Sequence, residues 1–226
     1  MQFPDKKLLI FDFDGTLIDS VPDLASALNA MLRTLGREPF SIETIREWVG
    51  NGAQTLVSRA LCGSRDFDEA ALAQEPLVEA LDIFLNYYEK NPTKETLLYD
   101  GVKETLQELH DRGYILSIVT NKPYKFIAPI LEALEIEDLF ALYIGADSLE
   151  HKKPHPEPLL HICKELGCSV EESLMIGDSK NDILAAKAAK MDSVAVSYGY
   201  NYGEDIRAYE PDVVIKHFSD LKQVVS

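Results

Sequence analysis

One short stretch, residues 8–17 (LLIFDFDGTL), constrains the fold more than any other part of the sequence. Its first four residues, Leu8–Phe11, form an apolar run that suits a buried parallel strand and is too short for a helix. Asp12 and Asp14 follow, and side chains two residues apart on an extended chain leave the same edge of the backbone. Two carboxylates so close together repel each other unless a cation lies between them or one holds a proton. The stretch therefore predicts a divalent metal site with a nucleophile beside it, and the alternative is a turn that is acidic by chance.

The composition indicates a globular chain: 226 residues, 46% of them hydrophobic, suffice for one sizeable core plus an insertion or small second domain. The formal net charge of −16 makes the chain a poor partner for nucleic acid or an anionic membrane. A small anionic substrate then needs a local positive group to hold it. We find neither an apolar leader before the first strand nor the roughly 20 apolar residues that span a bilayer, and we expect a cytoplasmic protein.

The cysteines and histidines show no metal-binding pattern in the sequence. Cys62, Cys163 and Cys168 cannot all pair as disulfides, which fits a reducing compartment. Cys163 lies in an apolar helical pattern and is expected to be a core thiol. None of the histidines is spaced as a metal ligand, and we interpret His155, which lies between two prolines, as part of a loop.

Residues 16–94 carry helical patterns. Apolar residues recur at helical spacing from residue 24 to residue 35, and Asp19 or Ser20 is placed to cap the start of that helix. Further helices are expected from Ser41 onward, over residues 54–61, and over about residues 69–90 with a kink at Pro76. We expect no strand between residues 18 and 90.

From residue 99 onward, helical and strand patterns alternate. The expected helices are residues 102–111, 123–134, 158–166 and 181–190, and the expected strands are residues 114–119, 141–144, 173–176, 194–196 and 213–215. This alternation predicts a parallel sheet with helices on both faces. We therefore predict an α/β fold, with a Rossmann-like core of residues 1–15 and 95–226 and an inserted all-α cap of residues 16–94.

Polar segments follow four of the expected strands, and ligands of open parallel sheets bind at the carboxyl ends of the strands. Asp12 and Asp14 follow the first strand. The other segments are Thr120-Asn121-Lys122, His151-Lys152-Lys153-Pro154 and Gly177-Asp178-Ser179-Lys180-Asn181-Asp182. They supply carboxylates, a hydroxyl and an ammonium group, which suit a site that holds a phosphoryl group and a hard cation.

These motifs resemble those of the haloacid dehalogenase-like phosphohydrolase superfamily, in the type with a helical cap after the first motif. The matching residues are Asp12-Phe13-Asp14-Gly15-Thr16, Thr120, Lys153-Pro154, and Gly177-Asp178-Ser179 with Asp182. The resemblance implies that Asp12 is the nucleophile that forms an aspartyl-phosphate. It also implies that Asp14 acts as general acid and then base, and that Thr120 and Lys153 bind phosphate oxygens.

The resemblance further implies Mg²⁺ as the cofactor. Asp12 and Asp178 would bind it through their side chains, Asp14 through its backbone carbonyl, and Asp182 would support the waters of the ion or Lys153. Oxygen-only ligands favour Mg²⁺ over zinc. Lys152 could take the place of Lys153, but the proline that follows favours Lys153.

Two details concern the substrate. Metal-free dehalogenases and phosphonate hydrolases of the superfamily lack an acid two residues after the nucleophile, so Asp14 argues for a phosphoester substrate. Asn121 is expected to turn its backbone amide toward the phosphate, and a simple strand-end role for Thr120 or Asn121 is the alternative.

The turn at residues 48–53 (WVGNGA), with Arg59, is the most distinctive part of the expected cap. Its glycines allow backbone amides to approach an anion, although it could also be an ordinary turn between helices. This turn, the KKPHPEP loop and residues 198–201 (YGYN) resemble bacterial phosphoglycolate phosphatases. That resemblance implies hydrolysis of 2-phosphoglycolate to glycolate and phosphate, and we expect cap amides near Asn51, or Arg59, to bind its carboxylate.

Other functions on the same scaffold stay open. Sugar-phosphate phosphatases and pyrophosphatases share it, and so does a sugar phosphomutase, which passes the phosphoryl group to another sugar hydroxyl. A non-enzymatic binding module is the third class, and nothing in the sequence requires it. We expect the protein to act as a monomer or a homodimer on a small phosphorylated substrate.

Overall fold

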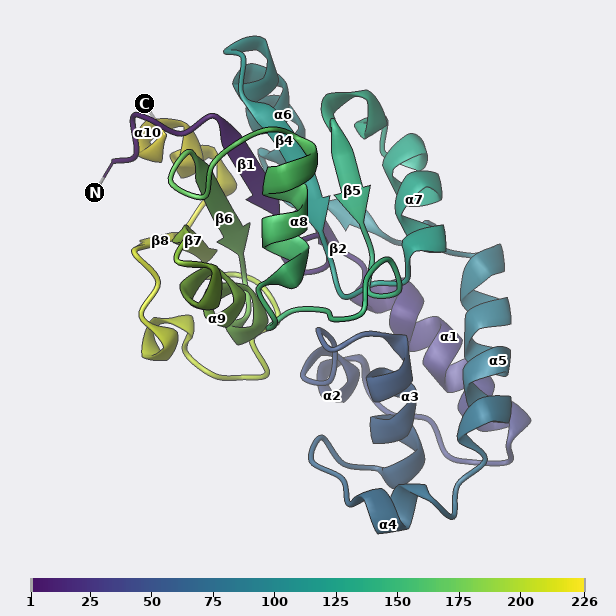
Figure 1. The fold of residues 1–226 in the computed structure, drawn as a ribbon. Helices are drawn as coiled ribbons and strands as arrows, with labels where there is room; N and C mark the ends of the chain where they lie inside the picture. The colour runs from purple at the N-terminus through teal and green to yellow at the C-terminus, as the bar shows by residue number, and fades with distance from the viewer. Residues whose placement is uncertain (1, 226) are drawn as a thin grey trace.

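A six-stranded parallel sheet forms the centre of the computed structural model, which describes residues 2–225 (Figure 1). The strand order is β5-β4-β1-β6-β7-β8. The strands are β1 (Leu8–Phe11), β4 (Ile115–Val119), β5 (Leu142–Ile144), β6 (Ser173–Gly177), β7 (Asp192–Val196) and β8 (Val213–Ile215). The predicted α/β fold is confirmed, and β1 lies in the interior of the sheet between β4 and β6.

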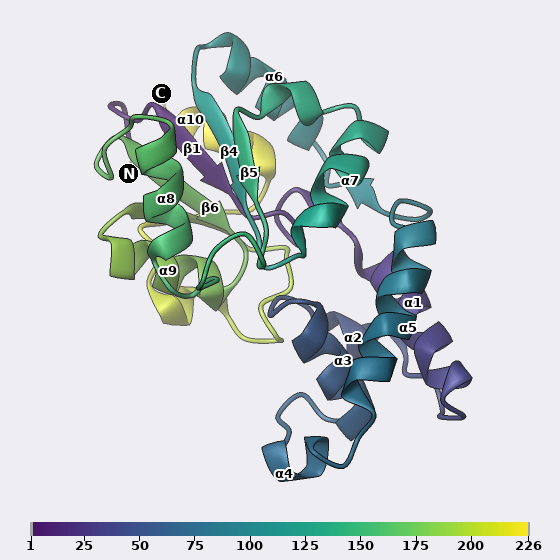
Figure 2. The ribbon, with the colours of Figure 1, turned by 45° about the vertical axis from the view of Figure 1, so that its right-hand side comes forward.

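Helices cover both faces of this sheet (Figures 1 and 2). One face carries α6 (Val102–Asp111), α7 (Ile127–Ala133) and α10 (Leu221–Val224), and the other carries α8 (Glu157–Glu165) and α9 (Lys180–Ala189). Side chains alternate along a strand, so Leu9 and Phe11 pack on the first face while Leu8 and Ile10 pack on the second. A strand buried on both faces must be apolar at every position, which explains the continuous run in β1.

Five helices lie apart from the sheet, on the side to which the strand arrows point (Figures 1 and 2). They are α1 (Val21–Thr34), α2 (Ile42–Arg46), α3 (Ala53–Cys62), α4 (Glu69–Leu72) and α5 (Leu77–Lys90), called here the helical group. The two connections to the sheet pair with each other, because β2 (Ile18–Asp19) is antiparallel to β3 (Leu97–Leu98). The expectation of no strand between residues 18 and 90 is therefore wrong at β2, whose partner lies far along the chain.

The stretch around Pro76 also differs from expectation. We expected one helix kinked at this proline, but the chain leaves the helical conformation after α4 and begins α5 at Leu77. A proline has no N–H group to donate to the preceding turn, and it disfavours helical angles at the residue before it. Pro76 therefore separates two helices instead of bending one.

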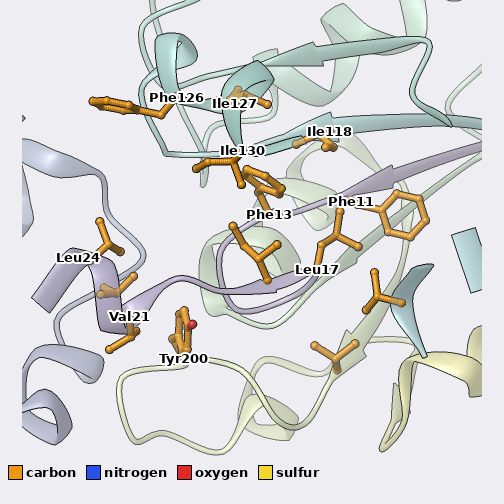
Figure 3. Packing of buried hydrophobic residues seen from close by; sticks show 14 of the residues in the cluster. Phe11, Phe13, Leu17, Val21, Leu24, Ile118, Phe126, Ile127, Ile130 and Tyr200 are labelled. Atoms are coloured by element: carbon orange, nitrogen blue, oxygen red, sulfur yellow. The ribbon is translucent and has the colours of Figure 1, made fainter. Parts of the chain in front are cut away.

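Apolar packing is continuous from the sheet into the helical group. Figure 3 shows Phe11, Phe13 and Leu17 leading from β1 toward Val21 and Leu24 of α1, and all five belong to one buried cluster. The residues that follow the first strand thus anchor the helical group to the sheet as well as carrying polar side chains.

Two expectations from composition concern the cysteines and the membrane. The three cysteines are free, and Cys163 is buried on α8, as predicted for a core thiol. Across residues 2–225, no helix has the length and apolar character needed to cross a membrane.

A buried carboxylate ties the outgoing and returning connections together. Asp23 of α1 is 3% exposed and accepts hydrogen bonds from the Thr96 backbone amide at 2.8 Å and the Thr96 hydroxyl at 2.7 Å. The backbone amide of Glu95 donates to the same carboxylate at 3.0 Å. Thr96 is buried, so its backbone amide depends on Asp23 for a partner, while its hydroxyl also reaches the Pro92 carbonyl at 3.3 Å.

We expect Asp23→Ala to lower the free energy of unfolding by about 2–3 kcal/mol, because the buried Thr96 amide and the half-buried Glu95 amide lose their acceptor. The control is Asp82→Ala, since Asp82 is an exposed carboxylate of α5; it should cost less than about 0.5 kcal/mol. Denaturant titrations monitored by circular dichroism measure both values. Equal losses for the two variants would contradict this role of Asp23.

Candidate active site

The polar segments predicted to converge do meet at the carboxyl ends of β1, β4 and β6. Their backbone positions follow from the strand register, since Phe11 pairs with Ile118 on one side and with Ile176 on the other. The residues just beyond these strand ends are therefore neighbours. Six of the predicted site residues are less than 9% exposed: Asp12, Thr120, Asn121, Lys153, Asp178 and Asp182.

Three buried carboxylates lie close together in this site. One oxygen each of Asp12, Asp178 and Asp182 lies within 4.8 Å of the others, and all three side chains are buried. Burial raises the pKa of Asp12 well above its ordinary range, and the charge of Asp182 raises it further. Burial and the charge of Asp182 likewise raise the pKa of Asp178 to about 7. Such a cluster is strongly stabilised by a cation, and its all-oxygen donor set fits Mg²⁺.

Asp178 is held in place by the backbone around it. Its carboxylate accepts hydrogen bonds from the Thr16 hydroxyl at 2.8 Å and from the Tyr200 backbone amide at 2.5 Å. A Cβ atom at Gly15 would lie 2.3 Å from the carboxylate, and one at Gly199 would lie 2.2 Å from it. Gly15 also has a positive φ of 91°. Glycine at these positions therefore lets two loops approach Asp178 closely.

Lys153 is the lysine that reaches the carboxylates. Its Nζ lies 2.9 Å from Asp12 Oδ1 and 2.6 Å from Asp182 Oδ1. Burial lowers the pKa of Lys153, but the attraction of Asp12 and Asp182 outweighs it, so the net direction is upward and the ammonium stays charged. Lys152 is exposed and donates instead to the backbone carbonyl of Asn51 at 2.7 Å.

Asp182 has two partners on its two oxygens. Oδ1 accepts from Lys153, while Oδ2 accepts from the backbone amide and hydroxyl of Ser179 at 3.0 and 2.8 Å. The contacts with Ser179 form a capping box at the start of α9. Asp182 thus links the beginning of a helix to the position of Lys153.

Asp14 lies on the side of the site that faces the helical group. Its Oδ1 accepts hydrogen bonds from the Ser20 hydroxyl and from Lys122 Nζ, the latter at 2.8 Å. Ser20 therefore uses its hydroxyl on Asp14, and it does not cap α1 as expected; the Asp19 carboxylate instead accepts from the Val21 amide at 3.3 Å. The sequence showed Lys122 beside Thr120 and Asn121, but gave no reason to assign it a role.

Thr120 and Asn121 follow β4 and have different surroundings. The Thr120 hydroxyl accepts from the Lys122 backbone amide at 3.1 Å. The Asn121 side chain donates to the carbonyls of Gly50 at 3.1 Å and Lys153 at 3.0 Å. Asn121 therefore connects the sheet to the turn at residues 48–53, a contact that sequence patterns do not reveal.

That turn lies directly against the end of the sheet. Besides Asn121, the side chain of Asn181 donates to the Gly50 carbonyl at 3.1 Å. Arg59 is 9% exposed, and its guanidinium donates to the carbonyls of Trp48 at 2.5 Å and Arg65 at 3.0 Å. Asn51 and Arg59 line an open hollow together with Lys152 and Lys153.

A small pocket of about 40 Å³ lies between the sheet and the helical group. Asp12, Asp14 and Thr120 line it from the sheet, and helices α1, α3 and α5 close it with mostly apolar side chains. A cavity of this size holds a few water molecules or part of a small ligand. The arrangement suits chemistry at Asp12 on a small molecule from which bulk water is excluded.

The fold brings two histidines and a glutamate close together as possible metal ligands, although the spacing of the histidines in the sequence did not indicate it. His151 and His155 lie with Glu157 so that one candidate ligand atom of each is within 4.8 Å of the others. His155 nevertheless has a local role, because its Nδ1 accepts a hydrogen bond from the Glu157 backbone amide at 3.2 Å. This group is at the surface, apart from the three buried carboxylates.

Comparison with known families agrees with this site. Residues 9–196 match the family model of the haloacid dehalogenase-like hydrolases. The chain belongs to this family, as the motifs predicted. The match includes all four polar segments at the strand ends.

Individual relatives are similar over nearly the whole chain. A phosphoglycolate phosphatase of Psychrobacter arcticus is 51% identical over 217 residues, which cover 96% of this chain and 94% of that protein. Phosphoglycolate phosphatase 1 of Pseudomonas aeruginosa is 43% identical over 215 residues, or 95% of this chain and 78% of that protein. The crystal structure of a predicted phosphoglycolate phosphatase from Haemophilus somnus has a TM-score of 0.89 at 38% identity, and the match covers 97% of this chain and 98% of that one.

We expect saturating Mg²⁺ to raise the melting temperature by about 5 °C, and to do so more at about pH 8 than at about pH 6. The folded pKa of Asp178, about 7, is above its unfolded value. Ionisation of Asp178 therefore destabilises the metal-free protein as the pH rises toward about 7, and protons compete with the ion below that pH.

Thermal unfolding with Mg²⁺ and with EDTA measures this effect. Asp178→Asn should abolish the rise, while Asp66→Asn, at an exposed carboxylate, should keep it. A rise of the same size in Asp178→Asn would contradict a cation site at the three carboxylates.

Proposed function

We propose that this protein is a Mg²⁺-dependent phosphatase that hydrolyses a small phosphorylated metabolite, most favourably 2-phosphoglycolate, to the alcohol and phosphate. The observation that carries the proposal is the position of Asp12 at the pocket, 2.9 Å from Lys153 and next to two further buried carboxylates. The names of the relatives support the choice of substrate.

Asp12 is the nucleophile of the proposed reaction and attacks phosphorus to form an aspartyl-phosphate. Its carboxylate repels a phosphate dianion, so positive charge near it is essential. Lys153 supplies one such charge and, with the Thr120 hydroxyl and the Asn121 backbone amide, binds the equatorial oxygens. Lys153 is preoriented for this by Asp182.

Asp14 acts as the general acid and then the general base of the proposed reaction. It protonates the leaving alkoxide in the first step, and in the second it takes a proton from the water that attacks the aspartyl-phosphate. Its carboxylate lines the same pocket as Asp12, which places it near the leaving group. The contacts from Ser20 and Lys122 hold it in this orientation.

Mg²⁺ would be held by the side chains of Asp12 and Asp178 and the backbone carbonyl of Asp14, with Asp182 close by. When bound, the ion reduces the charge repulsion between the nucleophile and the phosphate. Thr16 and Tyr200 fix the carboxylate of Asp178 for this role.

Residues 16–94 act as a cap in this proposal, and residues 1–15 and 95–226 form the catalytic core. The contacts of the turn at residues 48–53 with Asn121 and Asn181 support closure of the cap over the site. The backbone amides near Asn51, or Arg59, are one candidate for contacts to the substrate. We place the enzyme in the cytoplasm as a monomer or a homodimer, in keeping with its free cysteines.

The test of the proposed function is phosphate release from a panel of phosphoesters with Mg²⁺. The panel contains 2-phosphoglycolate, hexose phosphates, pyrophosphate and nucleotides, and the comparison is made on kcat/KM. The highest value for 2-phosphoglycolate is expected. A higher value for a hexose phosphate or pyrophosphate would replace the proposed substrate, and dependence on a bisphosphate activator would indicate a phosphomutase.

We expect Lys153→Met to lower kcat/KM by about 100-fold to 1,000-fold, because it removes a buried charge from the developing phosphoryl anion. Lys152→Met is the matched control, since Lys152 precedes Lys153 and donates to the backbone carbonyl of Asn51 instead of to the carboxylates. That change should cost less than about tenfold. Steady-state kinetics with 2-phosphoglycolate distinguish the two, and the reverse order would contradict the assignment.

A further inference from the structure

We propose that Lys122 and Tyr88 form a carboxylate-binding subsite that holds the leaving group of the substrate, separate from the phosphate-binding residues Thr120 and Lys153. The inference rests on the proposed function and names the groups that select its substrate. It differs from the candidates suggested by the sequence, Asn51 and Arg59.

Lys122 has spare hydrogen-bonding capacity in a buried place. The side chain follows β4, is 5% exposed, and makes a hydrogen bond from Nζ to Asp14 Oδ1 at 2.8 Å. An ammonium group has three N–H donors, so Asp14 and the adjacent Tyr88 oxygen leave one donor without an acceptor. Lys153, by comparison, has two carboxylates within 2.9 Å.

Tyr88 provides a second donor at the same place. It belongs to α5 and is 1% exposed, and its buried hydroxyl lies beside Lys122, an ammonium that can donate to the hydroxyl oxygen but cannot accept the hydroxyl proton. Its ring centroid lies 4.9 Å from Lys122 Nζ. A buried hydroxyl proton without an acceptor is unfavourable, which points to a ligand that supplies the missing acceptor.

The pocket around these two residues has one positive charge, next to the carboxylate of Asp14. Lys122 is the only positively charged residue among the described residues that line it. Leu24, Leu56, Phe84 and Phe126 form much of the remaining wall and offer no polar side-chain group. A carboxylate two atoms away from a phosphoester oxygen can therefore satisfy Lys122 and Tyr88 while the phosphoryl group lies at Asp12.

Arg59 has its guanidinium on other partners. It donates to the carbonyls of Trp48 and Arg65, and it lines the open hollow beside Lys152 instead of this pocket. These contacts suit a residue that holds the turn at residues 48–53 in shape. The two candidate positions for the carboxylate are therefore separable by mutation.

The experiment compares two esters that differ only in the proposed contact: 2-phosphoglycolate and 2-hydroxyethyl phosphate, in which a hydroxymethyl group replaces the carboxylate. We expect Lys122→Met to lower kcat/KM for 2-phosphoglycolate by about 30-fold more than for the neutral ester. Tyr88→Phe removes only the hydroxyl, so the fold is retained, and it should give a selective loss of about tenfold. Arg59→Ala should change both esters by the same factor.

Three results would overturn the subsite. Equal losses on both esters in Lys122→Met and Tyr88→Phe would mean that these residues only position Asp14. A selective loss in Arg59→Ala alone would place the carboxylate at Arg59. If the wild type hydrolyses other phosphoesters but not 2-phosphoglycolate, the proposed substrate is wrong and the subsite fails with it. The first two results leave the proposed function intact.

Discussion

The crowding of Asp12, Asp178 and Asp182 in one buried place is the constraint on which the rest of the site depends. Three carboxylates with oxygens within 4.8 Å of one another would repel strongly if each carried its charge without compensation. Lys153 offsets part of this charge, and a divalent cation would offset the rest. These carboxylates are unfavourable together without a cation, and in the proposed reaction the charges that compensate them also stabilise the phosphoryl group next to Asp12.

The surrounding structure holds this unfavourable arrangement in place. The register of β1 with β4 and β6 sets the distances between the segments that carry the charges. Gly15 and Gly199 let the chain approach Asp178, and the capping box of α9 orients Asp182 toward Lys153. The helical group packs on the same apolar cluster as the sheet, so the pocket beside Asp12 is closed by residues that belong to one core.

Patterns local in sequence predicted the fold well. The apolar run of β1 and the alternation after residue 99 identified the strands of the sheet, because burial on both faces requires continuous apolar segments. Contacts between residues that only the fold brings together were not predicted. β2 pairs with a distant partner, Tyr88 of α5 meets Lys122 across the pocket, and His151 meets His155 through a loop. The motif residues at strand ends were identifiable because strand direction alone brings them together.

The most direct test of the account is to trap the phosphoryl group on Asp12. A single turnover of radiolabelled 2-phosphoglycolate with Mg²⁺ is quenched in acid, the acyl phosphate is reduced with borohydride, and the reduced residue is located by peptide mass spectrometry. The account predicts covalent label in the intact enzyme, conversion of residue 12 to homoserine, and neither in Asp12→Asn. Turnover without any covalent label, or reduction at another residue, would contradict Asp12 as the nucleophile.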